Sequence, residues 1–285
     1  FPYFHAPERG GKGEVWLIFG LARSGVKVPQ KYFDAYYENV EAAVREKNGV
    51  LSDRKYTEYS RTVLALTAIG KNPADVAGFD LLKPLADFEQ VTRQGINGTI
   101  FALLALDSGN YEIPENPDAA VQATRQMYVD ELLARALPDG GWTLTGGEPD
   151  VDITAMTLQA LAKYREQPEV EAAVERGLAV LSSLQEPDGG YTSWGSSNSE
   201  SVAQVIVALT ELGVPLDDAR FVKNGVTVED ALLRFAQENG AFVHVRDGSG
   251  GDDGMATEQA FYALAAIHRA ETGETTLYDM TDVMQ

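Results

Sequence analysis

Four acidic side chains recur at similar places in the chain, each a few residues before a short apolar segment that begins with Ala. Asp152 and Glu200 stand eight residues before that Ala, Glu58 stands seven before it and Glu258 five before it. Repetition of one structural unit would bring these carboxylates to a common opening, where they could bind a cation or share proton transfer. Alternatively, the acids cap helix N-termini, where each contributes about 0.3 to 1 kcal/mol.

Two groups of aromatic residues accompany the acids. Trp142, Tyr191 and Phe242 close a recurring glycine-containing turn. They could line a hydrophobic or sugar-binding cavity, but burial between hairpins is the simpler interpretation of such anchors. The candidates for a cavity wall are aromatic residues outside this series: Trp194, Tyr59, Tyr262 and Phe261. An exposed Trp194 would suggest stacking on a ligand, whereas a buried one would plug its loop.

Missing residue types exclude several chemistries. The chain has no Cys, which excludes disulfides, a thiolate nucleophile and a Cys-ligated zinc. His5, His244 and His268 are the three histidines. His244 and His268 are isolated in the sequence, and we interpret them as structural or surface residues. No Ser-His-Asp arrangement, phosphate loop or dinucleotide fingerprint is present.

One loop is rich in oxygen donors. Asp247, Asp252 and Asp253 lie in an acidic, glycine-rich stretch that could bind calcium. Their spacing fits no standard calcium loop, and a flexible acidic turn is the simpler interpretation. We therefore expect no cofactor and no other metal.

The elements that must position these residues are repeated helical hairpins. Six apolar segments begin 45, 37, 58, 48 and 55 residues apart, at Gly20, Ala65, Ala102, Ala160, Ala208 and Ala263. A repeat of about 40 to 60 residues with helix-forming composition is typical of stacked helix pairs. The six segments predict inner helices. More charged segments with one apolar stripe predict outer helices over residues 29–47, 78–90, 116–137, 168–185 and 227–238.

Six inner helices that alternate with outer ones most simply close into a ring, because an open stack leaves apolar end faces that need caps. We therefore predict an all-α protein, an α/α toroid (α6/α6 barrel) that forms a single domain over residues 1–285. The repeats occupy about residues 12–270, and residues 271–285 are a short polar C-terminal tail on the outside or leading into a further segment.

Charge and hydropathy exclude other partners. The chain has 23 Lys and Arg against 43 Asp and Glu, a formal net charge of −20, so nucleic acid and anionic lipid surfaces would be repelled. No apolar run approaches the roughly 20 residues that a membrane span requires. The chain begins with Phe1 instead of Met, so we expect a processed or cut start, which removal of a signal peptide would explain.

Some of these residues resemble known repeats. The repeat of squalene and oxidosqualene cyclases is similar to one set of residues here: Arg176-Gly177, Leu181, Gln185, Gly189 and Tyr191. Class II terpene cyclases carry an Asp-x-Asp-Asp stretch whose middle Asp protonates an alkene or epoxide. Asp150-Val-Asp152-Ile153 resembles that stretch, with Ile153 in place of the last Asp. The resemblance implies that Asp152 is the acid, with Asp150 as a further catalytic candidate, and the repeat position adds Glu200.

Other members of this toroid superfamily imply other functions. Protein prenyltransferase β-subunits hold zinc with Asp, Cys and His, and a chain without Cys is not expected to share that chemistry. The cobalamin carriers intrinsic factor and transcobalamin are similar in their helical domain. Secreted bacterial proteins that join a toroid to other surface modules are the most similar group, through the helix starts Asp-x-Asp-x-Thr-Ala-Met and Asn-x-Glu-Ser-x-Ala-Gln.

We therefore expect a secreted or cell-surface protein that binds a small or extended ligand in a central cavity without catalysis, with additional surface modules outside this chain. The alternative is an enzyme: a terpene-cyclase-like isomerase that uses Asp152 as general acid, or a glycosidase that uses a carboxylate pair. If Asp152 and Glu200 both face a closed apolar cavity and have a raised pKa, the enzyme is favoured, whereas solvent-exposed helix caps would oppose it.

Overall fold

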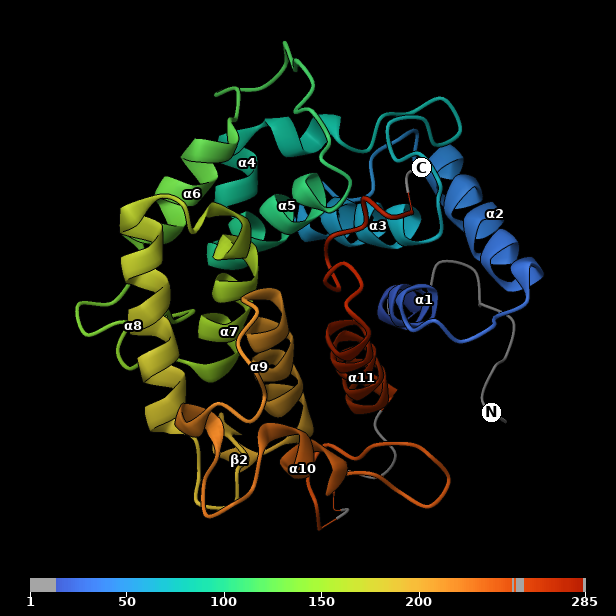
Figure 1. Cartoon of the computed structure of the whole chain (residues 1–285). Coiled ribbons are helices and arrows are strands. Elements are labelled where there is room, and N and C mark those ends of the chain that lie inside the picture. The colour runs from blue at the N-terminus through green and yellow to red at the C-terminus, as the bar shows by residue number, and fades with distance from the viewer. Residues whose placement is uncertain (1–13, 248, 250–253, 284–285) are drawn as a thin grey trace. The chain divides into compact units, whose positions relative to one another are not determined.

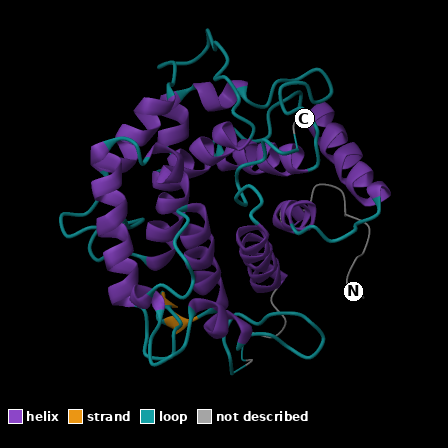
Figure 2. Cartoon of the chain, in the orientation of Figure 1, coloured by secondary structure: helices purple, strands orange, loops and turns teal. Residues whose placement is uncertain are grey.

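The computed structural model describes residues 14–247, 249 and 254–283, and these residues are mostly helical (Figures 1 and 2). The predicted all-α class is confirmed. The chain divides into two compact units. Unit 1 comprises the chain up to Tyr128 and from Tyr278 onward, and unit 2 comprises Val129–Leu277.

Unit 1 is built around three predicted inner helices: α1 (Glu14–Arg23), α3 (Thr57–Ala68) and α5 (Ile96–Ser108). α3 packs against both α1 and α5. α5 is buried along nearly its whole length, because its sequence is apolar on all sides and has no face suited to water. The other elements of the unit are α2 (Gln30–Glu46), the 3-10 helix η1 (Lys83–Ala86), α4 (Phe88–Thr92) and the first residues of α6 (Arg125–Ala134).

Unit 2 contains the other three predicted inner helices: α7 (Val151–Leu161), α9 (Ser199–Glu211) and α11 (Gly254–Thr272). α9 packs between α7 and α11 (Figure 1). The amphipathic α8 (Pro168–Leu184) packs on the outside of α7. The unit is completed by short elements: the 3-10 helices η2 (Ala162–Tyr164) and η3 (Ala219–Phe221), α10 (Val228–Leu233), and an antiparallel hairpin of β1 (Thr192–Ser193) and β2 (Ser196–Ser197).

The glycine-containing turns bury their aromatic anchors as predicted. Trp142 is fully buried, and its Nε1 donates to the carbonyl of Leu132 at 2.7 Å. Its backbone N–H donates to Thr154 Oγ1 at 2.9 Å, which ties the turn to the first turns of α7. The Phe242 turn repeats this contact with Thr257 of α11 at 3.0 Å. Tyr191 is also buried, so the packing interpretation of all three anchors is confirmed.

Two predicted outer helices are confirmed: residues 29–47 contain α2 and residues 168–185 contain α8. The prediction over 78–90 is wrong in its first part, where turns precede η1 and α4, and those over 116–137 and 227–238 are too long. For residues 116–124, the physical reason is that the chain pairs with the segment of η1 and α4. Phe88 N–H donates to Val121 O at 3.0 Å, and Ala123 N–H donates to Ala86 O at 2.8 Å. Backbone groups satisfied in this way need no helix.

The C-terminal tail differs from the prediction of an external polar segment. Tyr278 and Met280 are buried in unit 1, where the Tyr278 ring stacks on Phe19 at 5.3 Å between ring centroids. The buried guanidinium of Arg23 donates to Asp282 at 2.8 Å and to the carbonyl of Asp279 at 2.8 Å. A buried positive charge needs a carboxylate partner, and the tail supplies it.

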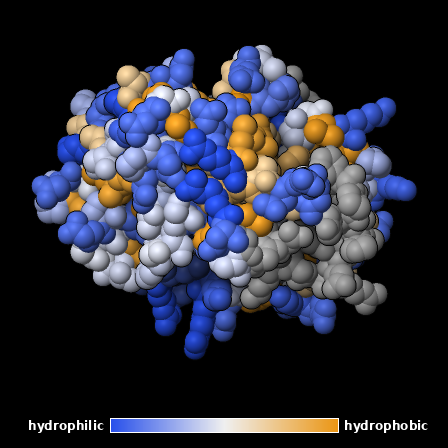
Figure 3. All heavy atoms as spheres, turned by 90° about the horizontal axis from the view of Figure 1, so that it is seen from below, coloured by the Kyte–Doolittle hydropathy of each residue, from blue (hydrophilic) through white to orange (hydrophobic). Residues whose placement is uncertain are grey.

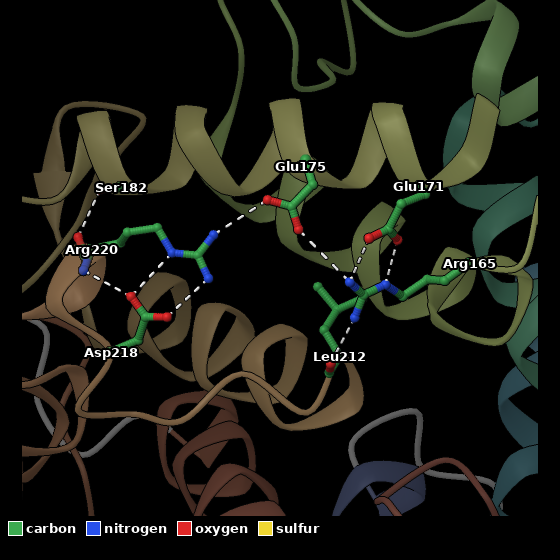
Figure 4. Close-up of polar contacts among 7 residues, drawn as sticks. All are labelled: Arg165, Glu171, Glu175, Ser182, Leu212, Asp218 and Arg220. Carbon is green, nitrogen blue, oxygen red and sulfur yellow. Dashed lines mark hydrogen bonds and ion pairs between the residues drawn. The ribbon is translucent and has the colours of Figure 1, made fainter. Parts of the chain in front are cut away.

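A surface ion-pair cluster ties the C-terminal ends of α7 and α9 to α8 (Figure 4). Arg165 binds Glu171 through two nitrogens, at 2.6 and 2.8 Å, and donates to the carbonyl of Leu212 at 3.0 Å. Glu175 joins this pair to Arg220, which also pairs with Asp218. The cluster holds one end of the two inner helices, while the acidic first turns lie at the other end.

On the face drawn in Figure 3, hydrophilic and hydrophobic side chains are interspersed. Within the described residues, no helix combines the length and the apolar character that crossing a membrane requires.

Trp142 tests the anchor's contribution to stability. We expect Trp142→Ala to lower the free energy of unfolding by about 3 to 5 kcal/mol, because it removes a fully buried ring. Trp142→Phe should cost about 1 to 3 kcal/mol, since it keeps a ring but leaves the Leu132 carbonyl without its donor. Urea denaturation measures both. The exposed Trp194→Phe is the control, and an equal loss in that variant would contradict the anchor role.

Candidate acidic site in unit 2

The first turns of α7 and α9 place Asp150, Asp152 and Glu200 in one acidic cluster, in which the charges of the other two influence Asp152. Asp150 is the N-cap of α7, and its Oδ1 accepts from Ile153 N–H at 2.9 Å. Its Oδ2 accepts from the Ser193 hydroxyl at 3.2 Å. Asp150, which is not one of the four acids considered as caps from the sequence, therefore caps α7, and its two oxygens are both engaged.

Asp152 differs from a helix cap. Its carboxyl is largely enclosed, and among the described residues its buried Oδ1 has no hydrogen-bond partner. Burial raises the pKa of Asp152 to about 6, and the negative charges of Asp150 and Glu200 contribute to the rise. The Ser201 and Ser193 hydroxyls oppose part of this shift, although Ser201 Oγ lies outside the geometry of a well-formed hydrogen bond. Asp152 therefore changes protonation close to neutral pH.

Glu200 binds a histidine that sequence analysis treated as isolated. His244 Nδ1 lies 3.0 and 2.9 Å from the two carboxylate oxygens of Glu200. Ser199 Oγ donates to Glu200 at 3.1 Å, and Ser199 N–H donates to the His244 carbonyl at 3.1 Å. The Glu200 side chain is 9% exposed and that of His244 is 38% exposed. The imidazole thus connects a buried carboxylate to solvent, so His244 is isolated in the sequence but has a partner in the structure.

The position of His244 in the repeat contains the signal that could have identified it. His244 follows its anchor Phe242 by two residues, and Ser193 follows its anchor Tyr191 by two residues. Each side chain contacts an acid at the start of the preceding inner helix: Ser193 binds Asp150 and His244 binds Glu200. Aligning the repeats on the anchors would have placed both next to the acids.

A chain of amides, buried at Gln159 and Gln204 and half-buried at Gln259, links the three inner helices of unit 2. Gln159 Nε2 donates to Gln204 Oε1 at 3.0 Å, and Gln204 Nε2 donates to Gln259 Oε1 at 2.9 Å and to Tyr262 Oη. Burial raises the pKa of Tyr262, and the charges of Asp152, Glu200 and Glu258 add to the shift. The Tyr262 phenol therefore stays neutral, and it donates to Gln259 Oε1 at 3.3 Å.

The structure places the other predicted binding residues in two groups. In unit 2, Glu258 and Phe261 are half-buried on α11, and Tyr262 is buried in the amide chain. In unit 1, Glu58 is half-buried in the first turn of α3, while Tyr59 is buried and accepts from Leu51 N–H at 3.0 Å. Tyr59 is thus a packing residue with a satisfied hydroxyl.

Trp194 forms the tip of the β1–β2 hairpin and is 79% exposed, which excludes the loop-plug interpretation. Its φ of 52° and that of Gly195, 84°, are both left-handed. Such a two-residue turn matches the twist of a hairpin, but it is unfavourable for a bulky side chain. The neighbouring Ser193 contacts Asp150, so the hairpin that carries the exposed indole is joined to the acidic cluster.

The calcium hypothesis concerns residues that are mostly outside the described ones. Asp252 and Asp253 belong to that part of the chain. Asp247 is exposed, and its Oδ1 accepts from Ser249 N–H at 2.9 Å, as in a simple acidic turn. In residues 14–247, 249 and 254–283, no three His, Asp or Glu side chains are arranged to hold a metal ion.

Comparison with known proteins adds no family assignment. No protein-family model matches this chain, and no curated protein matches it. The chemistry of the site must therefore be inferred from Asp152, Glu200 and His244 themselves.

The raised pKa of Asp152 predicts a specific pH dependence of stability. Its pKa is about 6 in the folded protein, against an ordinary value of 3.8, so between pH 4 and 6 the folded chain binds the proton more tightly than the unfolded chain. Stability contributed by this proton is lost as pH rises through that window, by roughly 3 kcal/mol in total.

Asp152→Asn should remove this dependence. As pH rises from 4 to 7, the free energy of unfolding of the variant should therefore fall less than that of wild type. Urea denaturation across that range measures both. Asp217→Asn, at an exposed position in the same unit, is the control and should follow the wild-type curve. Parallel curves for Asp152→Asn and wild type would show that Asp152 titrates normally.

Proposed function

We propose that unit 2 binds a ligand over the first turns of α7 and α9 and that Asp152 transfers a proton to it. The observation that supports this proposal is the enclosed Asp152 carboxyl, whose pKa of about 6 keeps part of it protonated near neutral pH and whose Oδ1 has no partner among the described residues. General acids work best when their pKa lies near the working pH.

The value of this pKa favours protonation of an oxygen atom. A carboxylic acid of pKa about 6 is weak, and it suits an epoxide or glycosidic oxygen better than an alkene carbon. Glu200 adds a second carboxylate to the site, which can stabilise positive charge that develops on the substrate. His244, bound to Glu200 and partly exposed, links this carboxylate to solvent.

The same proposal includes the finer architecture. We propose that the six inner helices close into an α/α toroid of the terpenoid cyclase and prenyltransferase type. Support comes from the order of packing, because α1, α3 and α5 are neighbours in unit 1 and α7, α9 and α11 are neighbours in unit 2. A role outside the cell or at its surface, beside further modules, remains part of this proposal.

A second function, binding without catalysis, is favoured by Trp194. An indole that is 79% exposed, on a hairpin joined to the acidic cluster, can stack on a sugar ring or another flat apolar group. In this function, Asp150 and Asp152 would accept hydrogen bonds from the ligand. The two functions share one binding site and differ in turnover.

Turnover distinguishes proton transfer to a ligand from binding without catalysis. We expect wild-type protein to convert either oxidosqualene, which is a terminal epoxide, or aryl glycosides, which carry a glycosidic oxygen. Mass spectrometry follows the products. Asp152→Asn has nearly the same shape but cannot donate the proton, so it should lower the rate by about 100-fold or more. Asp217→Asn should retain the wild-type rate. Equal rates for wild type and Asp152→Asn would remove Asp152 as the acid, and binding without any product would establish the second function.

Trp194→Ala tests the contact between hairpin and ligand. We expect it to weaken binding of the same compounds by up to about 10-fold, because stacking on an exposed ring contributes roughly 0.5 to 1.5 kcal/mol. Trp194→Phe should retain most of the affinity. Equilibrium dialysis measures both, and Leu184→Ala, an exposed apolar residue of α8, is the control. Unchanged affinity in Trp194→Ala would place the ligand elsewhere.

A further inference from the structure

Unit 1 contains an arginine in an unusual environment. Arg61, on α3, is half-buried, and its guanidinium carbon lies 5.9 Å from the centre of the Trp16 ring and 5.4 Å from that of Phe101. Trp16 comes from α1 and Phe101 from α5, so aromatic rings of both neighbouring helices contact the cation. Such contacts stabilise a guanidinium without neutralising it.

Arg61 also differs from other enclosed arginines of this chain in its partners. Arg23, Arg125 and Arg269 each form an ion pair with a carboxylate, at 2.8, 2.7 and 2.7 Å. Among the described residues, Arg61 has no such carboxylate, and its buried Nε has no hydrogen-bond partner. Glu58 lies one turn earlier on α3, but no ion pair joins the two. In a chain of net charge −20, an enclosed cation without a carboxylate is notable.

The repeat shows that Arg61 occupies a position used for polar contacts elsewhere. Arg61 stands four residues before Ala65, as Gln204 stands four before Ala208. Arg61 contacts side chains of the two flanking inner helices, and Gln204 does the same through Gln159 and Gln259. This position therefore faces the neighbouring inner helices in both units, but it carries a cation in unit 1 and an amide in unit 2.

We propose that Arg61 binds the anionic group of a small organic ligand, a carboxylate or a phosphate, whose apolar part contacts Trp16 and Phe101. A guanidinium has five N–H donors in a planar fork, which matches the oxygens of either anion. The aromatic rings already restrict the guanidinium, so little side-chain freedom is lost on binding. This site lies in unit 1 and does not depend on the acid chemistry proposed for Asp152.

The test measures binding of simple anions by titration calorimetry. Phenyl phosphate and benzoate combine an anion with a flat apolar ring and distinguish phosphate from carboxylate, while benzyl alcohol lacks the charge. We expect at least one of the two anions to bind wild-type protein and benzyl alcohol to bind at least ~10-fold more weakly. Arg61→Gln should weaken anion binding at least ~10-fold. Arg93→Gln, an exposed arginine of the same unit, should bind as wild type does.

Two further measurements keep the result decisive if Arg61→Gln fails to fold, which circular dichroism would reveal. Arg61→Lys keeps the charge but loses the planar fork, and it should bind measurably more weakly than wild type. In wild-type protein, the ¹⁵Nε resonance of Arg61 should shift on addition of the anion that binds. Absence of binding by both anions, an unshifted Arg61 Nε resonance, or equal weakening in Arg61→Gln and Arg93→Gln would overturn the proposal.

Discussion

In an inner helix that is enclosed on every side, a polar side chain is most stable against another polar group. α9 is the strongest case, because it is buried from Ser199 to Thr210 and still carries Glu200 and Gln204. A buried polar group without a partner costs several times what its hydrogen bond contributes. The partners must therefore come from the neighbouring helices and turns, and their positions fix how α7, α9 and α11 are aligned along their axes.

This constraint separates two kinds of position in the repeat. The anchors and the threonines that bind them serve the fold, since the Trp142–Thr154 and Phe242–Thr257 contacts are the same in two repeats. The positions that vary from repeat to repeat face the neighbouring inner helices instead. There the chain carries amides in α7, α9 and α11 and a guanidinium between aromatic rings in unit 1. Chemistry can change at these positions without altering the packing of the anchors.

Sequence analysis could predict what depends on local pattern. The inner helices, the amphipathic α2 and α8, and the burial of Trp142 follow from apolar spacing alone. The residues from 78 to 90 and from 116 to 124 could not be predicted, because these two segments satisfy backbone groups of each other across the chain, as Phe88 does with Val121. The pairing of His244 with Glu200 joins residues 44 positions apart in sequence. The pKa of Asp152 depends on burial, which its Asp-Val-Asp motif does not encode.

The hairpin that carries Trp194 has a consequence for the entropy of ligand binding at the proposed site. Its two turn residues both have left-handed backbone angles, and Ser193 is hydrogen-bonded to Asp150. Holding a bulky residue in that conformation costs on the order of 1 kcal/mol. This cost is part of the free energy of folding and is not added when a ligand binds. If the proposed ligand binds here, it therefore does not have to order the backbone of this loop.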